Sequence, residues 1–352
     1  MHFLFYIIHH NFPFVKVFSI CFSNPGIYTV AEWCYNNDMN KFTFSNNNKR
    51  YHTLAYYNKQ TFGARVEKAS LDAGFTCPNR DGTVSYGGCG FCSRGSSYFC
   101  GIGDLQTQLD REIERIHKKR KDAKIIAYFQ SGSNTHAPLE TLREIYEPII
   151  SDSRLCGLSI ATRADCIDCD IADYLSSIAK RTNLTVELGL QTASDATAKF
   201  INRSHTFEQF KNGFRLLKAR KIRVCVHIIN GLPDETQEDM LTTARKLGAL
   251  QPDAVKIHML HIVKGTPFAN LDFAMLTRDE YVDTVIKQLE ILPPTTVIER
   301  LTGDGDKRTL LHPEWTKNKI AVLAQIDREM ASRDTYQGRC YCQNFHNEYR
   351  KI

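Results

Sequence analysis

Residues 155–190, LCGLSIATRADCIDCDIADYLSSIAKRTNLTVELGL, contain one complete strand–helix–strand unit. Apolar and β-branched residues dominate 155–162 and 184–190, which predicts two buried strands. Between them, 170–180 has the apolar spacing of a helix and opens on Asp170, a capping residue type. A strand, a helix and a second strand in this order predict two parallel strands joined by a crossover helix.

The same alternation extends outward from this unit in both directions. Six strands, each followed by a crossover helix, predict a parallel sheet in an α/β fold. An open barrel and a flat doubly wound sheet both fit this pattern, and in either one the strand ends meet at one mouth. The further strand-like runs are 65–73, 123–130, 222–229 and 253–260, and the further helical stretches are 105–121, 138–151, 206–220 (opening on Thr206) and 235–250.

Polar residues follow the predicted strands at the points where reactive groups should gather. Residues 131–134 follow the second strand, Arg163 follows the third, and Glu187 to Gln191 end the fourth. Asn230 and Gly231 follow the fifth strand, so all of these residues are expected to face one mouth.

A loop with three cysteines follows the first strand: GFTCPNRDGTVSYGGCGFCSRG, residues 74–95. A structural zinc takes four ligands and closes its shell. An iron-sulfur cube has four irons, so three thiolates leave one iron open for a substrate or cofactor. Cys77, Cys89 and Cys92 therefore favour a cluster, and a zinc site with Cys100 as fourth ligand is the alternative.

The ending Cys89-Gly90-Phe91-Cys92 resembles the signature of the radical SAM superfamily, with Cys77 as the first ligand. The first gap is longer than the commonest spacing of three. It resembles the branch that includes the elongator catalytic subunit and, more closely, the bacterial YhcC/YtqA-like (MnmL-type) group. The resemblance covers residues 45–340 and includes GFTCPNRDGT, SIATRADC, VELGLQT, INRSHTFE, RVCVHIINGLP, VKIHMLHIVKGTP and RLTGDGDK.

This resemblance implies a partial (β/α)6 TIM-like barrel of the radical SAM type. It implies that Cys77, Cys89 and Cys92 hold a [4Fe-4S] cluster, with the amino and carboxylate groups of S-adenosylmethionine on the fourth iron. One electron from the reduced cluster then cleaves the sulfonium bond. The products are methionine and a 5′-deoxyadenosyl radical, which removes a hydrogen from the substrate.

The resemblance also assigns cofactor contacts residue by residue. Although SGSNTH (131–136) departs from the usual Gly-Gly-Glu turn, its Gly132 is expected to meet the methionine amino group. Glu187 is expected to contact the ribose or the amino group, and a buried ion pair inside the sheet is its alternative role. The other expected contacts are Phe91 near adenine, Arg163 on the methionine carboxylate, Gln191 beside the cofactor, and Gly231 where the backbone approaches adenine.

The YtqA-like group is associated with remodelling the wobble-uridine side chain of tRNA, on the route to 5-methylaminomethyl-2-thiouridine. The resemblance therefore implies a tRNA substrate and a one-electron donor such as flavodoxin or ferredoxin. The net charge of +6 permits an anionic partner without requiring one. Two alternatives stay open: radical chemistry on a small metabolite, and a non-catalytic, zinc-stabilised RNA-binding module.

Other residues have two readings each. Cys166 and Cys169, with Cys340 and Cys342, would supply four ligands for a second metal, or are unpaired thiols. His258, His261 and Lys264 lie at the end of the sixth strand and either contact substrate or cofactor or have structural roles. The basic run 117–121 is interpreted as the solvated end of a helix.

The chain of 352 residues is 42% hydrophobic and 24% charged, which excludes a disordered or fibrous protein. Its 12 cysteines lack the spacing of a disulfide scaffold and indicate a reducing compartment, so a cytoplasmic protein without membrane contact is expected.

Three regions are predicted along the chain. Residues 1–38 are too interrupted for a membrane span and lack a secretory signal, so they are expected to lie outside the fold. Residues 39–268 form the barrel core with its lead-in. Residues 269–352 form a smaller α+β extension with helices at 278–291 and 316–332 and a strand-like run at 295–303.

Overall fold

The structure is a computed structural model that describes residues 42–45, 47–93, 103–303, 305 and 308–341. These residues belong to one compact unit, Lys41–Ile352. The predicted leader, 1–38, lies outside the described residues.

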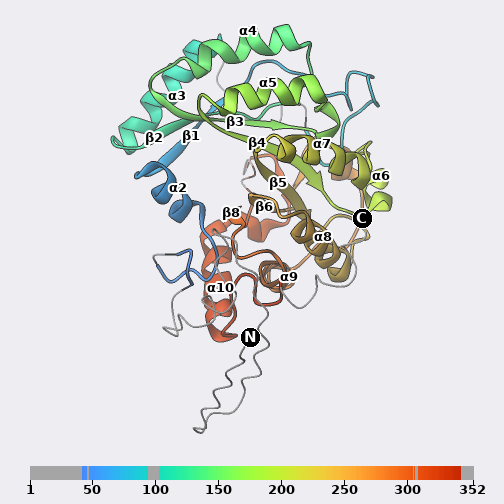
Figure 1. Ribbon diagram of the computed structural model, residues 1–352. Helices are drawn as coiled ribbons and strands as arrows, with labels where there is room; N and C mark the ends of the chain where they lie inside the picture. The colour runs from blue at the N-terminus through green and yellow to red at the C-terminus, as the bar shows by residue number, and fades with distance from the viewer. Residues whose placement is uncertain (1–41, 46, 94–102, 304, 306–307, 342–352) are drawn as a thin grey trace, which may run out of the picture. The chain divides into compact units, whose positions relative to one another are not determined.

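A parallel sheet of seven strands organises the fold, in the order β1-β2-β3-β4-β5-β6-β8 (Figure 1). The six predicted strands are confirmed, and their ends differ from the expected ones by at most two residues. They are β1 (Val66–Leu71), β2 (Lys124–Phe129), β3 (Leu155–Thr162), β4 (Asn183–Gln191), β5 (Arg223–Asn230) and β6 (Ala254–Met259).

Helices connect successive strands and cover the outer face of the sheet (Figure 1). Thr206 caps α7 through a capping box, as predicted, and its hydroxyl accepts a hydrogen bond from the Gln209 amide. The predicted cap Asp170 is wrong, because the Asp168 carboxylate accepts the Ile171 amide and Asp170 lies in the first turn. The crossover helices are α3 (Leu105–Lys119), α4 (Leu139–Ile150), α5 (Cys169–Ala179), α7 (Phe207–Ala219) and α8 (Gln237–Leu250), with the short α6 (Asp195–Phe200) before α7.

The two faces of the sheet differ in chemistry because side chains alternate along each strand. One set is apolar and packs under the helices, for example Leu158 and Ile160 of β3, in a single large core. The alternate set is mostly polar or charged and lines the inner face, for example Ser159 of β3 and Thr185 of β4. The strands therefore build a hydrophobic outside, buried under helices, and a polar inside.

The sheet curls, so that its polar face becomes concave. The Nζ atom of Lys68 on β1 lies 2.6 Å from an oxygen of Glu187 on β4, although two strands separate β1 from β4. In a flat sheet three strand spacings of about 4.8 Å would part these strands. The open barrel is thus correct, and the flat doubly wound sheet, left open by the sequence, is excluded.

The C-terminal region adds a seventh strand to this half-barrel. β8 (Val297–Arg300) pairs in parallel with β6, so the predicted number of six strands is one too few. Helices α9 (Arg278–Ile291) and α10 (Lys319–Ser332) confirm the two helices expected here, although α10 starts three residues later than predicted. A separate antiparallel pair joins β7 (Ile262–Val263) to β9 (Leu310–His312).

An unpredicted helix, α2 (Leu54–Phe62), precedes the sheet and contacts both of its edge strands, β1 and β8. Thr53, its capping residue, forms a parallel bridge with Ile298 of β8. α2 therefore lies where the sheet would continue if the barrel were closed.

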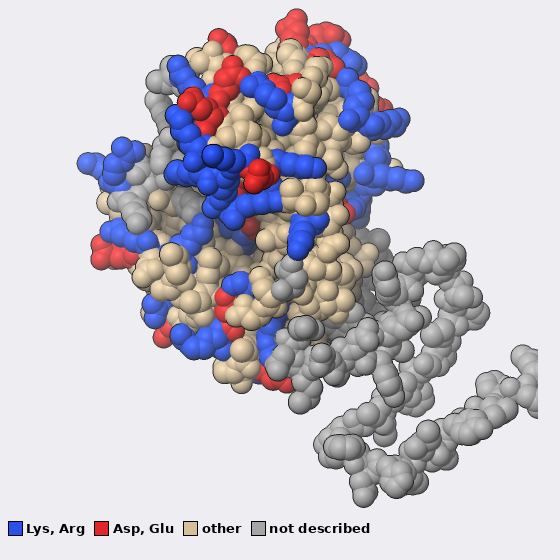
Figure 2. Space-filling view, turned by 90° about the vertical axis from the view of Figure 1, so that its left-hand side faces the viewer, with Lys and Arg blue, Asp and Glu red and all other residues tan. Residues whose placement is uncertain are grey.

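The basic run 117–121 forms the exposed C-terminal end of α3, as predicted. Arg120 and Arg65 both pair with Glu67, at 2.6 and 2.7 Å, which leaves this cluster with excess positive charge. Figure 2 shows Lys and Arg side chains gathered across this side of the molecule, with fewer Asp and Glu among them. In the described part of the chain, no helix has the length and apolarity needed to cross a membrane.

Candidate functional site

The loop after β1 folds back on itself and brings the first cysteine of the motif to the other two. The carbonyl of Cys77 accepts hydrogen bonds from the amides of Arg80 and Asp81, at 2.7 and 3.1 Å. The amide of Gly88 then donates to the carbonyl of Asn79 at 2.8 Å. These contacts make the eleven residues between Cys77 and Cys89 a compact turn, so the unusual spacing does not separate the thiols.

Cys89 and Cys92 lie on a tight turn, in which the Cys92 amide donates to the Cys89 carbonyl at 2.9 Å. Gly90 anchors this turn to two other segments. Its amide donates to the carbonyl of Ile201, and its carbonyl accepts the amide of Phe268. A Cβ on Gly90 would lie 2.2 Å from the Phe268 ring, so the close packing requires glycine here.

The segment after α6 holds the cysteine loop in place through hydrogen bonds from Asn202. The side-chain amide of Asn202 donates to the carbonyls of Tyr86 and Gly88, at 3.0 and 2.9 Å. The side-chain amide of Asn79 donates to the Asn202 carbonyl at 2.5 Å and approaches the Cys89 sulfur at 3.6 Å. The loop is therefore held by side chains from two separate parts of the chain.

The three thiols lie within electrostatic range of one another. Burial raises the pKa of the Cys92 thiol, and Cys89 and Cys77 raise it further, against a hydrogen bond from Arg80 that lowers it. Cys89 is buried, while Cys77 and Cys92 are partly exposed. Three thiolates at this place would repel one another, so the loop needs a cationic centre to hold them in that form.

Three arginines surround the thiols and supply positive charge. Arg203 points an Nη atom at the Cys89 sulfur, 3.9 Å away. Arg80 donates to the Cys92 carbonyl at 2.7 Å. Burial would lower the pKa of Arg163, but Asp165 and, more weakly, Cys77 and Cys89 raise it above its usual value. An anionic iron-sulfur centre would be stabilised by these charges.

The donor set fits a cluster better than a single metal ion. Among the residues that the structure describes, no three His, Cys, Asp or Glu side chains converge to hold one ion. In a [4Fe-4S] cube each thiolate binds a different iron, so the thiols need not meet at one point. Nε of Arg203 and Oδ1 of Asn79 are buried beside Cys89 without a partner in the described structure, as expected next to a polar group. Cys100, the fourth ligand of the zinc alternative, lies outside the described residues.

Gly132, just after β2, packs closely against the start of the cysteine loop. Its φ of +72° lies in the left-handed region, and a Cβ would come 2.2 Å from the carbonyl oxygen of Phe75. The next residue, Ser133, donates its amide to the Thr76 carbonyl at 2.9 Å. Gly132 thus allows the β2 end to touch the chain directly before Cys77, and its expected contact with methionine stays a prediction.

Arg163, at the end of β3, is buried and its guanidinium is occupied within the protein. Nε and one Nη donate to the two oxygens of Asp165, at 2.9 and 2.6 Å. The other Nη donates to the Arg203 carbonyl at 2.9 Å. Arg163 therefore connects the end of β3 to the segment at Arg203, which lies next to Cys89. Its expected pairing with a cofactor carboxylate stays a prediction.

Phe91 and Gln191 line the same cavity, which has a volume of about 230 Å³. Gln191 lies at an irregularity in the pairing of β4 with β5 and has a φ of +73°. The remaining walls come from β5, β6 and β7 and include His227, His258 and His261. The structure thus brings two of the expected cofactor contacts together beside the cysteine loop, where a cofactor on the cluster would be expected.

Gly231 turns the chain after β5 with a φ of +81°. Its amide donates to the sulfur of Met240 at 3.3 Å, and a Cβ would lie 3.2 Å from Leu276. The left-handed turn explains why glycine stands at this position. Its expected approach to adenine stays a prediction.

Glu187 is fully buried on the inner face and accepts from four side chains. Lys68 and Tyr128 donate to it at 2.6 and 2.9 Å, His227 lies 2.8 Å away, and Lys256 forms an ion pair with it. Burial alone would raise the pKa of Glu187, but Lys256 and Lys68 hold it well below the usual value. The structure thus shows the ion-pair alternative, and a cofactor contact would have to displace one of these partners.

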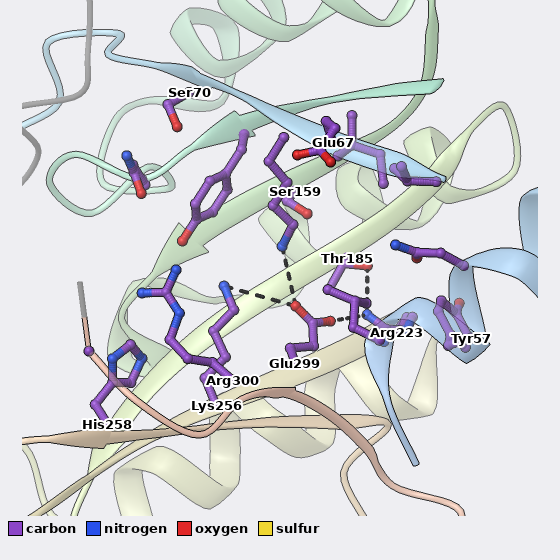
Figure 3. Close-up of a pocket in the computed structure, with 18 of the residues that line it drawn as sticks. Tyr57, Glu67, Ser70, Ser159, Thr185, Arg223, Lys256, His258, Glu299 and Arg300 are labelled. Atoms are coloured by element: carbon purple, nitrogen blue, oxygen red, sulfur yellow. Dashed lines mark hydrogen bonds and ion pairs between the residues drawn. The ribbon is translucent and has the colours of Figure 1, made fainter. Parts of the chain in front are cut away.

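A second carboxylate joins this inner charge cluster, which we define as Lys68, Glu187, Arg223, Lys256 and Glu299. Glu299 on β8 lies 2.9 Å from Arg223 and 3.2 Å from Lys68. All of these side chains except Glu187 line an interior cavity of about 1020 Å³, and Figure 3 shows Lys256 and Arg223 converging on Glu299 there. The half-barrel therefore encloses a large, charged space.

The second cysteine pairs do not form one site in the described structure. Cys166 is partly buried, and burial followed by Asp165 raises its pKa to about 12. Cys169 is exposed at the start of α5, and the Cys340 amide donates to the Glu290 carbonyl on α9. Cys342, the fourth ligand expected for a second metal, lies outside the described residues.

Sequence reasoning gave no role to Asn79, Asn202 or Arg203, which hold the cysteine loop. Asn79 stands in GFTCPNRDGT, and Asn202 and Arg203 stand in INRSHTFE, so their motifs were noted without a function. The φ of Asn202, +52°, marks a left-handed position that Asn tolerates well. The sequence offered one signal for this role, the Asn202-Arg203 pair that follows a short helix.

Comparison with known proteins agrees with this geometry. The model of the Radical SAM superfamily matches residues 77–247, and that of the Radical_SAM C-terminal domain matches 252–332. The chain is 48% identical to YtqA of Bacillus subtilis over 311 residues, which cover 86% of this chain and 96% of YtqA. It is 33% identical to YhcC of Escherichia coli K12 over 276 residues, covering 76% of this chain and 88% of YhcC.

Among solved structures, Elp3 of the archaeon Methanocaldococcus infernus has a similar fold, with a TM-score of 0.58 and 16% identity. The likeness covers 80% of this chain and 68% of the archaeal one. The three-thiol loop, the curled sheet and these matches together confirm the expected cofactors, a [4Fe-4S] cluster and S-adenosylmethionine. The chain belongs to the radical SAM superfamily, in the group that includes YtqA and YhcC.

Proposed function

We propose that this radical SAM enzyme modifies the wobble-uridine side chain of tRNA, on the route to 5-methylaminomethyl-2-thiouridine. The observation that carries the proposal is the 48% identity to YtqA over nearly the whole of both chains. The YtqA-like group is the one that the sequence motifs resemble and that is associated with this modification.

When bound, the cluster and S-adenosylmethionine supply reductive cleavage of a sulfonium bond and so a radical able to remove an unactivated hydrogen. The protein would hold the cluster through Cys77, Cys89 and Cys92. The cavity beside Phe91 and Gln191 would hold the nucleoside end of the cofactor away from water. The walls of the interior cavity would orient the substrate.

The charged surface supports an RNA partner. Figure 2 shows a basic face of the molecule, on which Lys and Arg side chains gather. The exposed basic residues of the chain include Lys59, Arg65, Arg120 and Lys124. Lys124 donates to the carbonyl of Phe62, which also lines the interior cavity, so basic residues adjoin one end of that cavity. RNA phosphates would lie on the basic face while a single base, unstacked from its neighbours, enters the half-barrel.

Two further features belong to the same proposal. The enzyme needs a one-electron reductant, and a flavodoxin or ferredoxin would serve. A cytoplasmic site of action follows from a tRNA substrate and from the free thiols of the described cysteines.

The test is anaerobic reconstitution with cofactor, reductant and tRNA from a strain that lacks the gene, followed by nucleoside analysis of the tRNA. We expect a new modified nucleoside, formed with methionine and 5′-deoxyadenosine, and none with the Cys89→Ala variant. An unchanged nucleoside profile would reject the tRNA substrate. Cofactor cleavage stimulated by a small metabolite, but not by tRNA, would select the metabolite alternative. Colourless protein without iron that still binds RNA would select the zinc-stabilised module.

A further inference from the structure

We propose that Arg203 is a positioning residue that sets the reduction potential of the cluster, through a hydrogen bond from its guanidinium to the sulfur of Cys89. Cys89 is one of the three expected cluster ligands. The proposal goes beyond the proposed function, because it concerns the cluster and holds for any substrate.

The guanidinium of Arg203 has two acceptors in the described structure. One Nη atom donates to the Cys89 sulfur at a distance of 3.9 Å. The other Nη atom donates to the Gly189 carbonyl on β4 at 2.5 Å. The third nitrogen, Nε, is buried and has no hydrogen-bond partner among the described residues. A buried N–H group without an acceptor costs free energy, so Nε indicates that a further polar group belongs beside it.

The backbone of Arg203 holds this side chain in one place. Its amide donates to the carbonyl of Ala198 on α6 at 2.8 Å. Its carbonyl accepts a hydrogen bond from Arg163 at 2.9 Å. The residue is only 6% exposed, so its guanidinium acts on Cys89 in a site that is largely shielded from water.

The charge of Arg203 is directed at a sulfur and not at a carboxylate. In the part of the chain that the structure describes, Arg203 forms no ion pair within 4.0 Å. Asp165 lies in the electrostatic field of Arg203, but its two oxygens accept from Arg163 at 2.9 and 2.6 Å. A charge in a buried place acts on its neighbours more strongly than a charge at the surface.

This geometry has a direct effect on a cluster held by Cys89. A reduced cluster carries one more negative charge than an oxidised one. A hydrogen-bond donor at a ligand sulfur, and a positive charge beside it, therefore stabilise the reduced form and raise the reduction potential. Asn79 approaches the same sulfur at 3.6 Å with a neutral amide, so Arg203 is the charged donor of the two.

Gly189 connects Arg203 to the cofactor cavity. A Cβ on Gly189 would lie 2.7 Å from Nε2 of Gln191 and 3.0 Å from an Nη atom of Arg203. Glycine therefore leaves room for both side chains at the end of β4. Gln191 lines the cavity beside Phe91, so Arg203 contacts a cluster ligand on one side and the strand that carries an expected cofactor contact on the other.

The experiment uses the full-length protein with its cluster reconstituted and compares variants at equal iron content. A redox titration followed by electron paramagnetic resonance measures the ratio of reduced to oxidised cluster at fixed potentials. We expect Arg203→Gln to lower this ratio about tenfold, which is a shift of about 59 mV for a one-electron couple. Arg203→Lys keeps the charge but has one nitrogen for two acceptors, so it should lower the ratio by only about threefold.

The matched control is Arg215→Gln, which makes the same chemical change at an exposed arginine on α7. It should leave the ratio unchanged. The inference is overturned if Arg203→Gln has the wild-type ratio, if Arg203→Lys falls as far as Arg203→Gln, or if Arg215→Gln falls equally. Should Arg203→Gln fail to fold or to hold iron, Arg203→Lys becomes the test, and a wild-type ratio in that variant overturns the inference.

The two proposals fail separately. A lowered potential in Arg203→Gln, combined with no modification of tRNA by the wild type, would support the role of Arg203 and reject the tRNA substrate. Modification of tRNA by the wild type, combined with an unchanged potential in Arg203→Gln, would keep the proposed function and reject the role of Arg203.

Discussion

Lys68 on β1 and Glu299 on β8 lie on opposite edge strands of a seven-stranded sheet, and their side chains are 3.2 Å apart. No backbone hydrogen bonds join these two strands in the described structure. The inner charge cluster therefore bridges the open side of the half-barrel, and its ion pairs connect the first and last strands.

We expect Lys256→Met to lower the free energy of unfolding by about 3 kcal/mol, because it leaves Glu187 buried with one fewer cation. The exposed pair Lys118–Glu114 is the matched control, and Lys118→Met should cost less than about 1 kcal/mol. Urea denaturation monitored by circular dichroism measures both. Equal effects of the two substitutions would mean that the inner ion pairs do not stabilise the fold.

The cysteines give a prediction about metal content. Cys89→Ala should abolish the cluster, since only two protein thiolates would remain to hold a cube that needs three. The control is Cys169→Ala, because Cys169 is exposed at the start of α5 and lies outside the loop. Iron and sulfide analysis after anaerobic reconstitution, together with the visible spectrum, is the measurement. Full iron content in Cys89→Ala would contradict the assignment, and loss of iron in Cys169→Ala would revive a second metal site.

Alanine substitutions at Gly132 and Gly265 distinguish the cost of backbone strain from the cost of a steric clash. Both have a positive φ, +72° and +83°, but a Cβ on Gly265 would meet nothing within 4 Å. Gly265→Ala should therefore cost only about 1 kcal/mol of stability. Gly132→Ala should cost more and also lower the iron content, because its Cβ would push the Phe75 carbonyl and so displace Cys77. If both variants keep the same iron content as the wild type, the contact between β2 and the cysteine loop has no role in holding the cluster.

Glu235 gives a pH dependence of stability. Burial raises its pKa from the usual value to about 7, against a hydrogen bond from Thr192 at 2.5 Å that lowers it. The folded state binds the Glu235 proton more tightly than the unfolded state does. The stability that this proton adds is therefore complete below pH 4.5 and is lost as pH rises toward 7. Glu235→Gln should therefore be more stable than the wild type at pH 8, by about 2 kcal/mol, and should remove this slope. Thermal unfolding at pH 5 and pH 8 tests it, and parallel pH curves for both proteins would refute it.

The strands could be predicted from sequence because each of them repeats one local pattern. In β3, for example, the apolar run that ends at Thr162 is bounded by polar residues, and this information is contained within eight residues. The curvature of the sheet could not be predicted in the same way. It depends on side chains such as Lys68 and Glu187, which are 119 positions apart and have no shared local signal.

The candidate site shows the same division. Cys77, Cys89 and Cys92 are recognisable because ligands of a cluster have fixed chemistry and nearly fixed spacing. Arg163 lies next to the thiols, as its place after β3 suggested. Its guanidinium, however, donates two hydrogen bonds to Asp165, only two residues away, and the sequence gave no sign of that pairing. The strand-like run 295–303 contains β8, but its membership of the main sheet could not be predicted, because its pairing with β6 joins residues 43 positions apart, such as Val255 and Ile298.

Helix α2 has a consequence for any shortened form of the protein. It contacts both β1 and β8, so it shields the rims of an unclosed barrel. A chain that begins after Phe62 would leave the outer backbone groups of β1 and β8 ready to pair with another molecule. Such a truncation would keep every cysteine of the cluster loop and still produce self-associating, insoluble protein.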